Sequence, residues 1–150
     1  MTETNAQSAV DMRFQDNTEL PETDRDCISQ VYAGNFGNER MIERNRARID
    51  WVVSQIEGKR VLDIGCSEGI ISILAGRSGF EATGIDLNSE AIAFARRELA
   101  KEPEEVQARV AFIRNDPDHI DLPKASFDCV ILTEVIEHLV DPAPIIESAK

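Results

Sequence analysis

The stretch that decides the fold is Val61-Leu62-Asp63-Ile64-Gly65-Cys66-Ser67-Glu68-Gly69. Residues 60–64 (RVLDI) are a β-rich run that stops at Gly65, which can turn tightly because it has no Cβ. Gly69 opens the next helix, whose N-terminus adds exposed N–H groups and the positive end of a dipole. Small residues at 65, 67 and 69 would let a ligand approach the backbone closely. In an open α/β sheet, ligands bind at such a crevice at the carboxyl ends of the strands.

The spacing of the small residues separates this loop from the dinucleotide-binding fingerprint. That fingerprint has small residues at the first, third and sixth places of the loop. Counted from Gly65, the sixth place is the bulky Ile70. Asp63, just before the loop, would repel a pyrophosphate and suits a ligand with a cationic group. The loop therefore favours a cationic ligand over a dinucleotide.

Strand-like and helix-like runs alternate around this loop. Strands are expected at 60–64, 80–85, 110–114 and 127–132, and helices at 68–75 and 89–101. Asn88 or Ser89 can cap the second of these helices. The strand runs are short and almost continuously apolar, as in sheets that are covered on both faces. This order predicts an α/β, Rossmann-like three-layer fold with a mainly parallel sheet.

The residues before the first strand fall into two parts. Residues 1–26 are acidic and polar and are expected to form a flexible N-terminal arm. Residues 27–58 are expected to be a helical lead-in, with a helix over 39–56, and residues 59–150 the ligand-binding domain. An apolar stripe at helical spacing supports the lead-in helix. Its members are Met41, Ile42, Ile49, Val52, Val53 and Ile56, with Trp51 as a further candidate.

Charge and composition restrict the classes of function. The 150 residues include 28 acidic and 16 basic ones, for a net charge of -12. The resulting field disfavours a nucleic-acid partner. Arg40, Arg44, Arg46 and Arg48 form a local basic cluster, for which a solvated helix face is the simplest interpretation. No membrane span and no secretory signal is recognisable, so a cytoplasmic location is expected. Three cysteines without a CxxC motif indicate neither a disulfide framework nor a zinc site of that kind.

Four segments, in order and spacing, resemble the class I S-adenosylmethionine (SAM) dependent methyltransferases. They are VLDIGCSEG at 61–69, GIDLN at 84–88, RND at 114–116 and FDCVILTEVIEHLVDP at 127–142. Ser67 stands where the broadest pattern has glycine and is a tolerated variant. The resemblance implies SAM as cofactor and methyl transfer to a small-molecule or sugar acceptor, with O-methylation as the expected chemistry. It also implies a seven-stranded sheet, of which the first four strands, in the order 3-2-1-4, are recognisable here.

The resemblance places SAM against the ends of these strands. Asp86 ends the second strand about 20 residues after Gly65, where a carboxylate can accept both ribose hydroxyls. A turn aspartate is the alternative. In the family, the residue at the position of Asp116 accepts a hydrogen bond from the adenine amino group. Asp63 and Gly65 resemble the groups that face the amino end of the methionine part of SAM. The complete set expected to contact SAM is Asp63, Gly65, Cys66, Ser67, Gly69, Asp86, Leu87, Asp116 and Thr133.

Glu134, Glu137 and His138 are the candidates for chemistry at the acceptor. Their i, i+3, i+4 spacing would put them on one face of a helical segment. Three interpretations stay open. Glu134 or His138 acts as a general base or contacts the acceptor. The trio holds a divalent metal, as a similar E-x-x-E-H stretch does in small-RNA 3′-terminal 2′-O-methyltransferases. The residues are structural. Glu134 and His138 are the expected catalytic residues, and no metal is assigned, since His119, the other histidine, lies in a different loop.

The chain stops inside the helix that is expected after the fourth strand. The fourth strand would then be an exposed apolar edge, which favours a homo-oligomer. An incomplete domain keeps two alternative functions open: a non-catalytic SAM-binding module, and a metal-dependent RNA 2′-O-methyltransferase. A nicotinamide or flavin dehydrogenase domain is disfavoured by Ile70 and Asp63.

Overall fold

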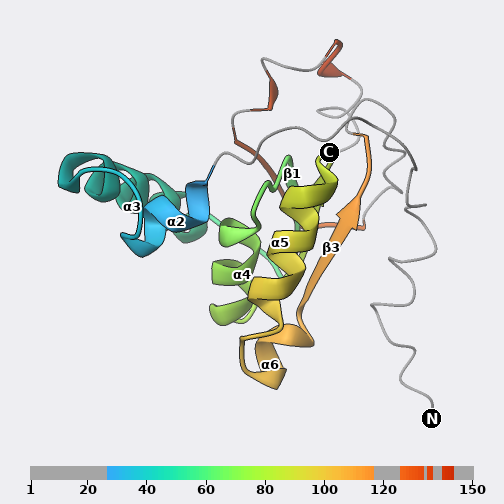
Figure 1. Ribbon diagram of the computed structural model, residues 1–150. Helices are drawn as coiled ribbons and strands as arrows, with labels where there is room; N and C mark the ends of the chain where they lie inside the picture. The colour runs from blue at the N-terminus through green and yellow to red at the C-terminus, as the bar shows by residue number, and fades with distance from the viewer. Residues whose placement is uncertain (1–26, 117–125, 134, 137–139, 144–150) are drawn as a thin grey trace.

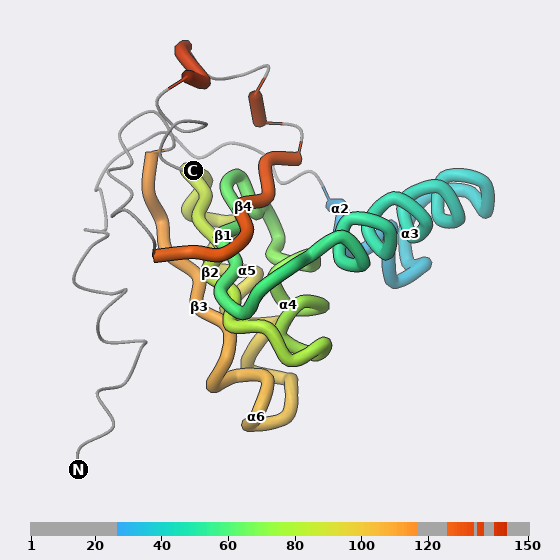
Figure 2. The backbone as a smooth tube through the Cα atoms, turned by 180° about the vertical axis from the view of Figure 1, so that it is seen from behind, coloured from blue at the N-terminus to red at the C-terminus, as the bar shows by residue number. Residues whose placement is uncertain are grey.

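The computed structural model describes residues 27–116, 126–133, 135–136 and 140–143. The elements are α2 (Ile28–Ala33), α3 (Glu39–Ser54), β1 (Arg60–Ile64), α4 (Ile70–Arg77), β2 (Glu81–Asp86), α5 (Ser89–Leu99), α6 (Glu104–Gln107), β3 (Val110–Arg114) and β4 (Cys129–Leu132). The four strands form one parallel sheet in the order β3-β2-β1-β4 (Figures 1 and 2). The predicted α/β class and the predicted strand order are therefore confirmed.

The sheet is buried on both faces. Successive side chains of a strand point to opposite sides, so Val61 and Ala82 pack in one cluster with α4 and α5. Both helices lie on that face of the sheet (Figures 1 and 2). Leu62, Ile64 and Ile85 point the other way into a second cluster and are 0% exposed. The central strands β1 and β2 thus have no side that faces water, as expected for a three-layer fold.

The lead-in shares the core of the sheet. Ile49 and Ile56 of this segment are buried in the cluster that α4 and α5 form with the sheet. The expectation that Met41 and Trp51 belong to the apolar stripe is wrong, because their side chains are 45% and 63% exposed. Trp51 follows Ile49 by two residues, which is about 200° around the helix axis. Within the described ranges, no helix has the length and apolar character needed to cross a membrane.

Several element ends differ from the expected ones by about two residues. Helix α4 begins at Ile70 rather than at residue 68, because Ser67 and Gly69 have left-handed φ angles of 49° and 78°. Helix α3 ends at Ser54 instead of residue 56. Helix α5 begins as expected, with Asn88 Oδ1 accepting hydrogen bonds from the N–H groups of the first turn. The glycine loop consequently extends to residue 69, which lengthens the segment available for a site.

Candidate functional site

Four strand ends meet at one edge of the sheet. The parallel register sets the last apolar residues of the strands side by side, in the order Ile113, Ile85, Ile64 and Leu132. The residue that follows each of them therefore stands at the same edge, in the order Arg114, Asp86, Gly65 and Thr133. Three residues of the expected site are thus brought together from three separate strands.

The loop after β1 is tied to the end of β2. The N–H groups of Gly65 and Cys66 donate to the carbonyl oxygen of Ile85 at 2.8 and 3.0 Å. The N–H of Ser67 donates to Asp86 Oδ2 at 2.7 Å, and the N–H of Asn88 donates to Asp86 Oδ1 at 2.8 Å. These bonds fix the Asp86 carboxylate beside the loop. Each carboxylate oxygen can accept more than one hydrogen bond, so a ligand hydroxyl can share them.

The two glycines of the loop make room for the protein's own side chains. Gly65 and Gly69 have φ angles of 72° and 78°, which are left-handed. A Cβ at Gly65 would lie 2.0 Å from Val135 Cγ2, and one at Gly69 would lie 2.4 Å from the Phe112 ring. The sequence led us to expect a ligand at these close approaches, but the structure fills them with Val135 and Phe112. Ser67, between them, is half-buried and has a left-handed φ of 49°.

Asp63 lies beneath the loop. Its side chain is 0% exposed, and Ser72 Oγ of α4 donates to its Oδ2 at 2.8 Å. Its other oxygen, Oδ1, has no hydrogen-bond partner among the described residues. Burial raises the pKa of this carboxyl to about 7, opposed by the bond from Ser72 and reinforced by the negative charge of Asp86. Asp63 therefore faces α4 in this structure.

The ends of β2 and β3 bring the remaining cofactor candidates to the same edge. Leu87 follows Asp86 and is 39% exposed, so it offers apolar surface there. The N–H of Asn115 donates to the Asp86 carbonyl oxygen at 3.0 Å. Asn115 Oδ1 in turn accepts from the N–H of Asp116 at 2.8 Å, and Asp116 is half-buried. The acidic residues that end β2 and follow β3 are thus held close in the backbone network, whereas the Cys66 side chain is buried.

Glu68 is a residue that the sequence argument missed. Its side chain is 0% exposed, and its Oε2 accepts the N–H of Ser29 at 2.9 Å. Helix α2 begins after Cys27, which makes no side-chain cap hydrogen bond. A carboxylate from the glycine loop therefore does the work of an N-cap for α2. The contact joins residues 39 positions apart, so no local pattern indicates it.

We expect Glu68→Ala to lower the free energy of unfolding by about 2 kcal/mol, since a buried hydrogen bond to a carboxylate is lost. Urea unfolding measures this loss. Glu105→Ala is the matched control, because Glu105 is exposed on α6 and such substitutions stay within about 0.5 kcal/mol. Equal stability of the two variants would show that Glu68 does not hold α2.

The residues expected to do chemistry at the acceptor lie outside the described part of the chain. These are Glu134, Glu137 and His138; His119, the other histidine of the chain, also lies outside it. Thr133, which precedes them, is described and half-buried at the end of β4. The described residues contain no group of three or more His, Cys, Asp or Glu side chains that could hold a metal ion.

Comparison with known proteins agrees with the fold. Residues 62–150 match a family model described as a methyltransferase domain. The ubiquinone biosynthesis O-methyltransferase of Aeromonas salmonicida is 33% identical over 107 residues, which cover 69% of this chain and 44% of that protein. The chain spans about half the length of the curated relatives that it matches.

Two solved structures have a similar fold. The methyltransferase domain of bacterial CtHen1 is 28% identical, with a TM-score of 0.56 over 69% of this chain and 56% of that one. The glycopeptide N-methyltransferase MtfA, solved in complex with SAM, is 23% identical, with a TM-score of 0.55 over 63% of this chain and 39% of that one. The second likeness concerns the fold alone.

Proposed function

The chain belongs to the methyltransferase domain family, and on that premise we propose that it is the SAM-binding part of an enzyme that methylates an oxygen atom of a small-molecule acceptor. The observation that carries the proposal is the bond from Ser67 N–H to Asp86 Oδ2 at 2.7 Å. It joins the glycine loop and the acid of β2 into one wall of the crevice. The choice of oxygen and of a small acceptor is supported by the name of the ubiquinone relatives.

The residues at this edge fit the parts of SAM. The Asp86 carboxylate would accept the ribose hydroxyls, because both of its oxygens are already fixed by backbone N–H groups. Leu87 would cover the adenine or ribose with apolar surface, and Asp116 would accept the adenine amino group. The backbone of Gly65, Cys66, Ser67 and Gly69 would follow the methionine part, and Thr133 would lie on the side of the methyl group.

Asp63 would act on the cationic end of SAM through its charge. Its buried carboxyl has an oxygen without a described partner, and a positive charge above the loop would favour the ionised form. Direct contact with the methionine amino group would require a movement of the loop, since the side chain is 0% exposed. We therefore assign Asp63 to electrostatic support of the cofactor site.

SAM supplies a methyl group that its sulfonium has already activated. The chain has to bind it, orient the acceptor and exclude water. An oxygen acceptor also has to lose a proton, for which Glu134 or His138 is the proposed base. In the sequence, Glu134 follows Thr133 directly and His138 comes four residues later. No metal is part of this proposal.

Calorimetric titration with SAM and with S-adenosylhomocysteine, its demethylated product, tests the cofactor site. Asp86→Ala should weaken binding about tenfold or more, because charge-assisted hydrogen bonds are lost. Glu105→Ala, an exposed carboxylate on α6, should bind like the wild type. Asp86→Asn removes the charge and one of the two acceptor oxygens, so it should also weaken binding, and circular dichroism checks the fold. Unchanged affinity in Asp86→Ala would remove Asp86 from the site.

Three further features belong to the same proposal. We divide the chain into an arm (1–26), a lead-in (27–58) and the SAM-binding domain (59–150). A homo-oligomer through the sheet edge at β4 stays a prediction from the sequence. A cytoplasmic location and the absence of a nucleic-acid partner stay predictions from the sequence.

A further inference from the structure

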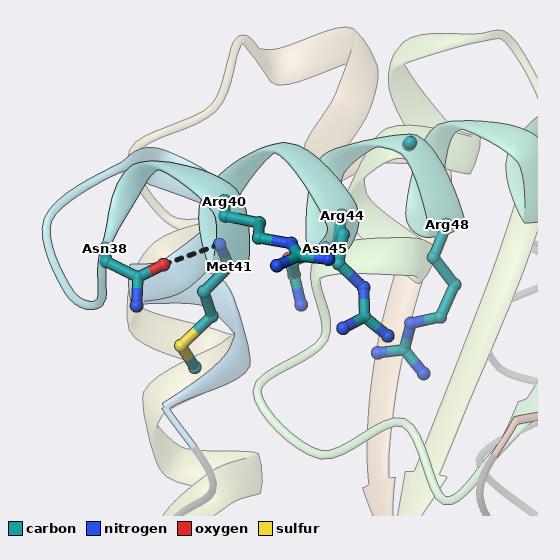
Figure 3. Close-up of a pocket in the computed structure, with 7 residues that line it drawn as sticks. Asn38, Arg40, Met41, Arg44, Asn45 and Arg48 are labelled. Carbon is teal, nitrogen blue, oxygen red and sulfur yellow. Dashed lines mark hydrogen bonds between the residues drawn. The ribbon is translucent and has the colours of Figure 1, made fainter.

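Helix α2 is capped by the glycine loop and not by its own N-cap residue. Helices α3 and α5 are capped by the side chains of Asn38 and Asn88, and Figure 3 shows the hydrogen bond that Asn38 accepts at the start of α3. Cys27, at the same position of α2, makes no side-chain cap hydrogen bond. Glu68 Oε2 accepts the Ser29 N–H at 2.9 Å in its place. The start of α2 is therefore held from the loop.

Helix α2 is too short to be stable by itself. It spans the six residues Ile28–Ala33, and helices shorter than about 12–15 residues are marginal in water. Val31 is 3% exposed, and Ile28 and Tyr32 pack against the core cluster. The Tyr32 hydroxyl donates to Asp50 of α3 at 2.7 Å, and α3 lies beside α2 in both views (Figures 1 and 2). The order of α2 thus depends on this packing and on its bond to Glu68.

Ser67 precedes Glu68 in the loop and binds a different partner. Its N–H donates to Asp86 Oδ2 at 2.7 Å, and Asp86 is the residue proposed to accept the ribose hydroxyls of SAM. Ser67 has a left-handed φ of 49°, which is unfavourable for a residue with a Cβ. Such a conformation persists only where the surrounding structure holds it. One strained residue therefore stands between the acid of the cofactor site and the cap of α2.

The two contacts of the loop restrain the same strained backbone. Loss of the bond between Glu68 and Ser29 removes one of these restraints, so the Ser67 N–H would stay at Asp86 for less of the time. In the other direction, a cofactor bound to Asp86 and the loop backbone would hold the loop, and with it Glu68, in the position that caps α2. A coupling of this kind is reciprocal, because both contacts favour the same conformation.

We propose that Glu68 is a positioning residue that couples the SAM crevice to the lead-in. SAM binding favours the docked position of α2, and docked α2 strengthens SAM binding. The inference rests on the proposed function, which places the cofactor against Asp86 and the glycine loop. Glu68 acts through the loop and not by touching the cofactor, because its side chain is 0% exposed and its Oε2 faces α2.

Hydrogen exchange and calorimetry test the coupling, with S-adenosylhomocysteine (SAH) as the ligand. In the wild-type chain, SAH should slow the amide exchange of Ile28–Ala33. Glu68→Ala should speed this exchange, remove the effect of SAH on it, and weaken SAH binding about fivefold or more. Glu68→Gln keeps a side-chain oxygen that can accept the Ser29 N–H, so it should recover most of the affinity.

Two further variants separate the coupling from other effects. Gly79→Ala strains a left-handed φ of 96° before the start of β2, whereas Asp86 stands at the end of that strand. It should lower the stability and leave SAH affinity unchanged while circular dichroism shows a folded chain. Val31→Ala removes a buried side chain of α2 and leaves Glu68 in place. It should weaken SAH binding, and combination with Glu68→Ala should weaken binding no further than the stronger single change.

The outcomes distinguish this inference from the proposed function. A wild-type chain that does not bind SAH would contradict the proposed function, and this inference with it. The coupling alone is overturned if the wild type binds SAH and Glu68→Ala binds it equally tightly, or if SAH leaves the exchange of Ile28–Ala33 unchanged. Additive losses of affinity from Val31→Ala and Glu68→Ala would also overturn it, because Glu68 would then act on SAH binding without α2.

Discussion

Replacing Gly69 by alanine is expected to lower the free energy of unfolding by about 3 kcal/mol. The left-handed φ of 78° costs an alanine about 1–2 kcal/mol. The added Cβ would also lie 2.4 Å from the Phe112 ring and 2.8 Å from Ala95 Cβ. Phe112 is 5% exposed and also fills the hollow over Gly84. The ring has little space to retreat, so overpacking adds about 1–3 kcal/mol.

Two other glycines separate the causes of this loss. Gly79 has a φ of 96° with nothing within 4 Å of an added Cβ, so Gly79→Ala measures backbone strain alone. Gly76 lies inside α4, where an added Cβ would meet Val110 at 2.3 Å without left-handed strain. Gly76→Ala therefore measures the cost of the steric overlap with Val110. The higher helix propensity of alanine offsets part of that cost. Urea unfolding of the three variants should rank Gly69→Ala as the least stable. Equal losses of unfolding free energy in Gly69→Ala and Gly79→Ala would show that the Phe112 ring moves aside without cost.

The fold was predictable where apolar runs end at clear breakers. Strands β1 and β3 have the expected bounds, since Arg60–Ile64 stops at Gly65 and Val110–Arg114 stops before polar residues. Helix α2 was expected only as an undivided part of the helical lead-in and α6 was not predicted, because six and four residues are too few to set up a periodic pattern. Helix α2 is capped by Glu68, which lies 39 residues from Ser29 in the sequence. The residues of α2 therefore contain no signal for this cap.

The site was predictable only at the level of strand ends. The pairing of Gly65 with the Asp86 strand follows from parallel topology, which the alternation of strands and helices indicates. The partners of the glycines do not follow, because Val135 and Phe112 come from other segments of the chain. The burial of Asp63 against Ser72 is equally invisible, since an acid before a glycine loop fits an exposed ligand contact as well.

Asp63→Asn is expected to change the pH dependence of stability. The folded chain holds this carboxyl at a pKa of about 7, against an ordinary value of 3.8. Below about pH 4 the group is protonated in the folded and unfolded chains and contributes nothing. As the pH rises from 4 to 7, only the unfolded chain releases the proton, so the wild type loses stability. Above pH 7 the full penalty stays, about 4 kcal/mol. The asparagine of the variant cannot ionise, so the variant does not lose this stability as the pH rises.

The measurement is the difference in unfolding free energy between Asp63→Asn and the wild type, from urea titrations at pH 4 to 8. The contributions of the other carboxylates are the same in both chains and therefore cancel in this difference. The stability of Asp63→Asn relative to the wild type should increase as the pH rises, mainly between pH 4 and 7. A difference that stays flat would mean that Asp63 is already ionised in its buried place, held by Ser72 alone.

Asp128→Asn should change the pH dependence of stability in the opposite direction. It therefore serves as a control for any general effect of replacing an aspartate by asparagine. The Arg60 guanidinium and the N–H groups of Arg60 and Lys59 bind the Asp128 carboxylate, which holds its pKa below the usual range. Its stabilisation is present above about pH 4 and is lost as the pH falls through the folded pKa. The deficit of the variant should therefore be constant above about pH 4 and shrink as the pH falls below 4 towards the folded pKa, in urea titrations extended to that range. Asp63 and Asp128 would then shift the pH dependence of stability in opposite senses, because the first is buried beneath the glycine loop and the second is paired with Arg60 at the surface.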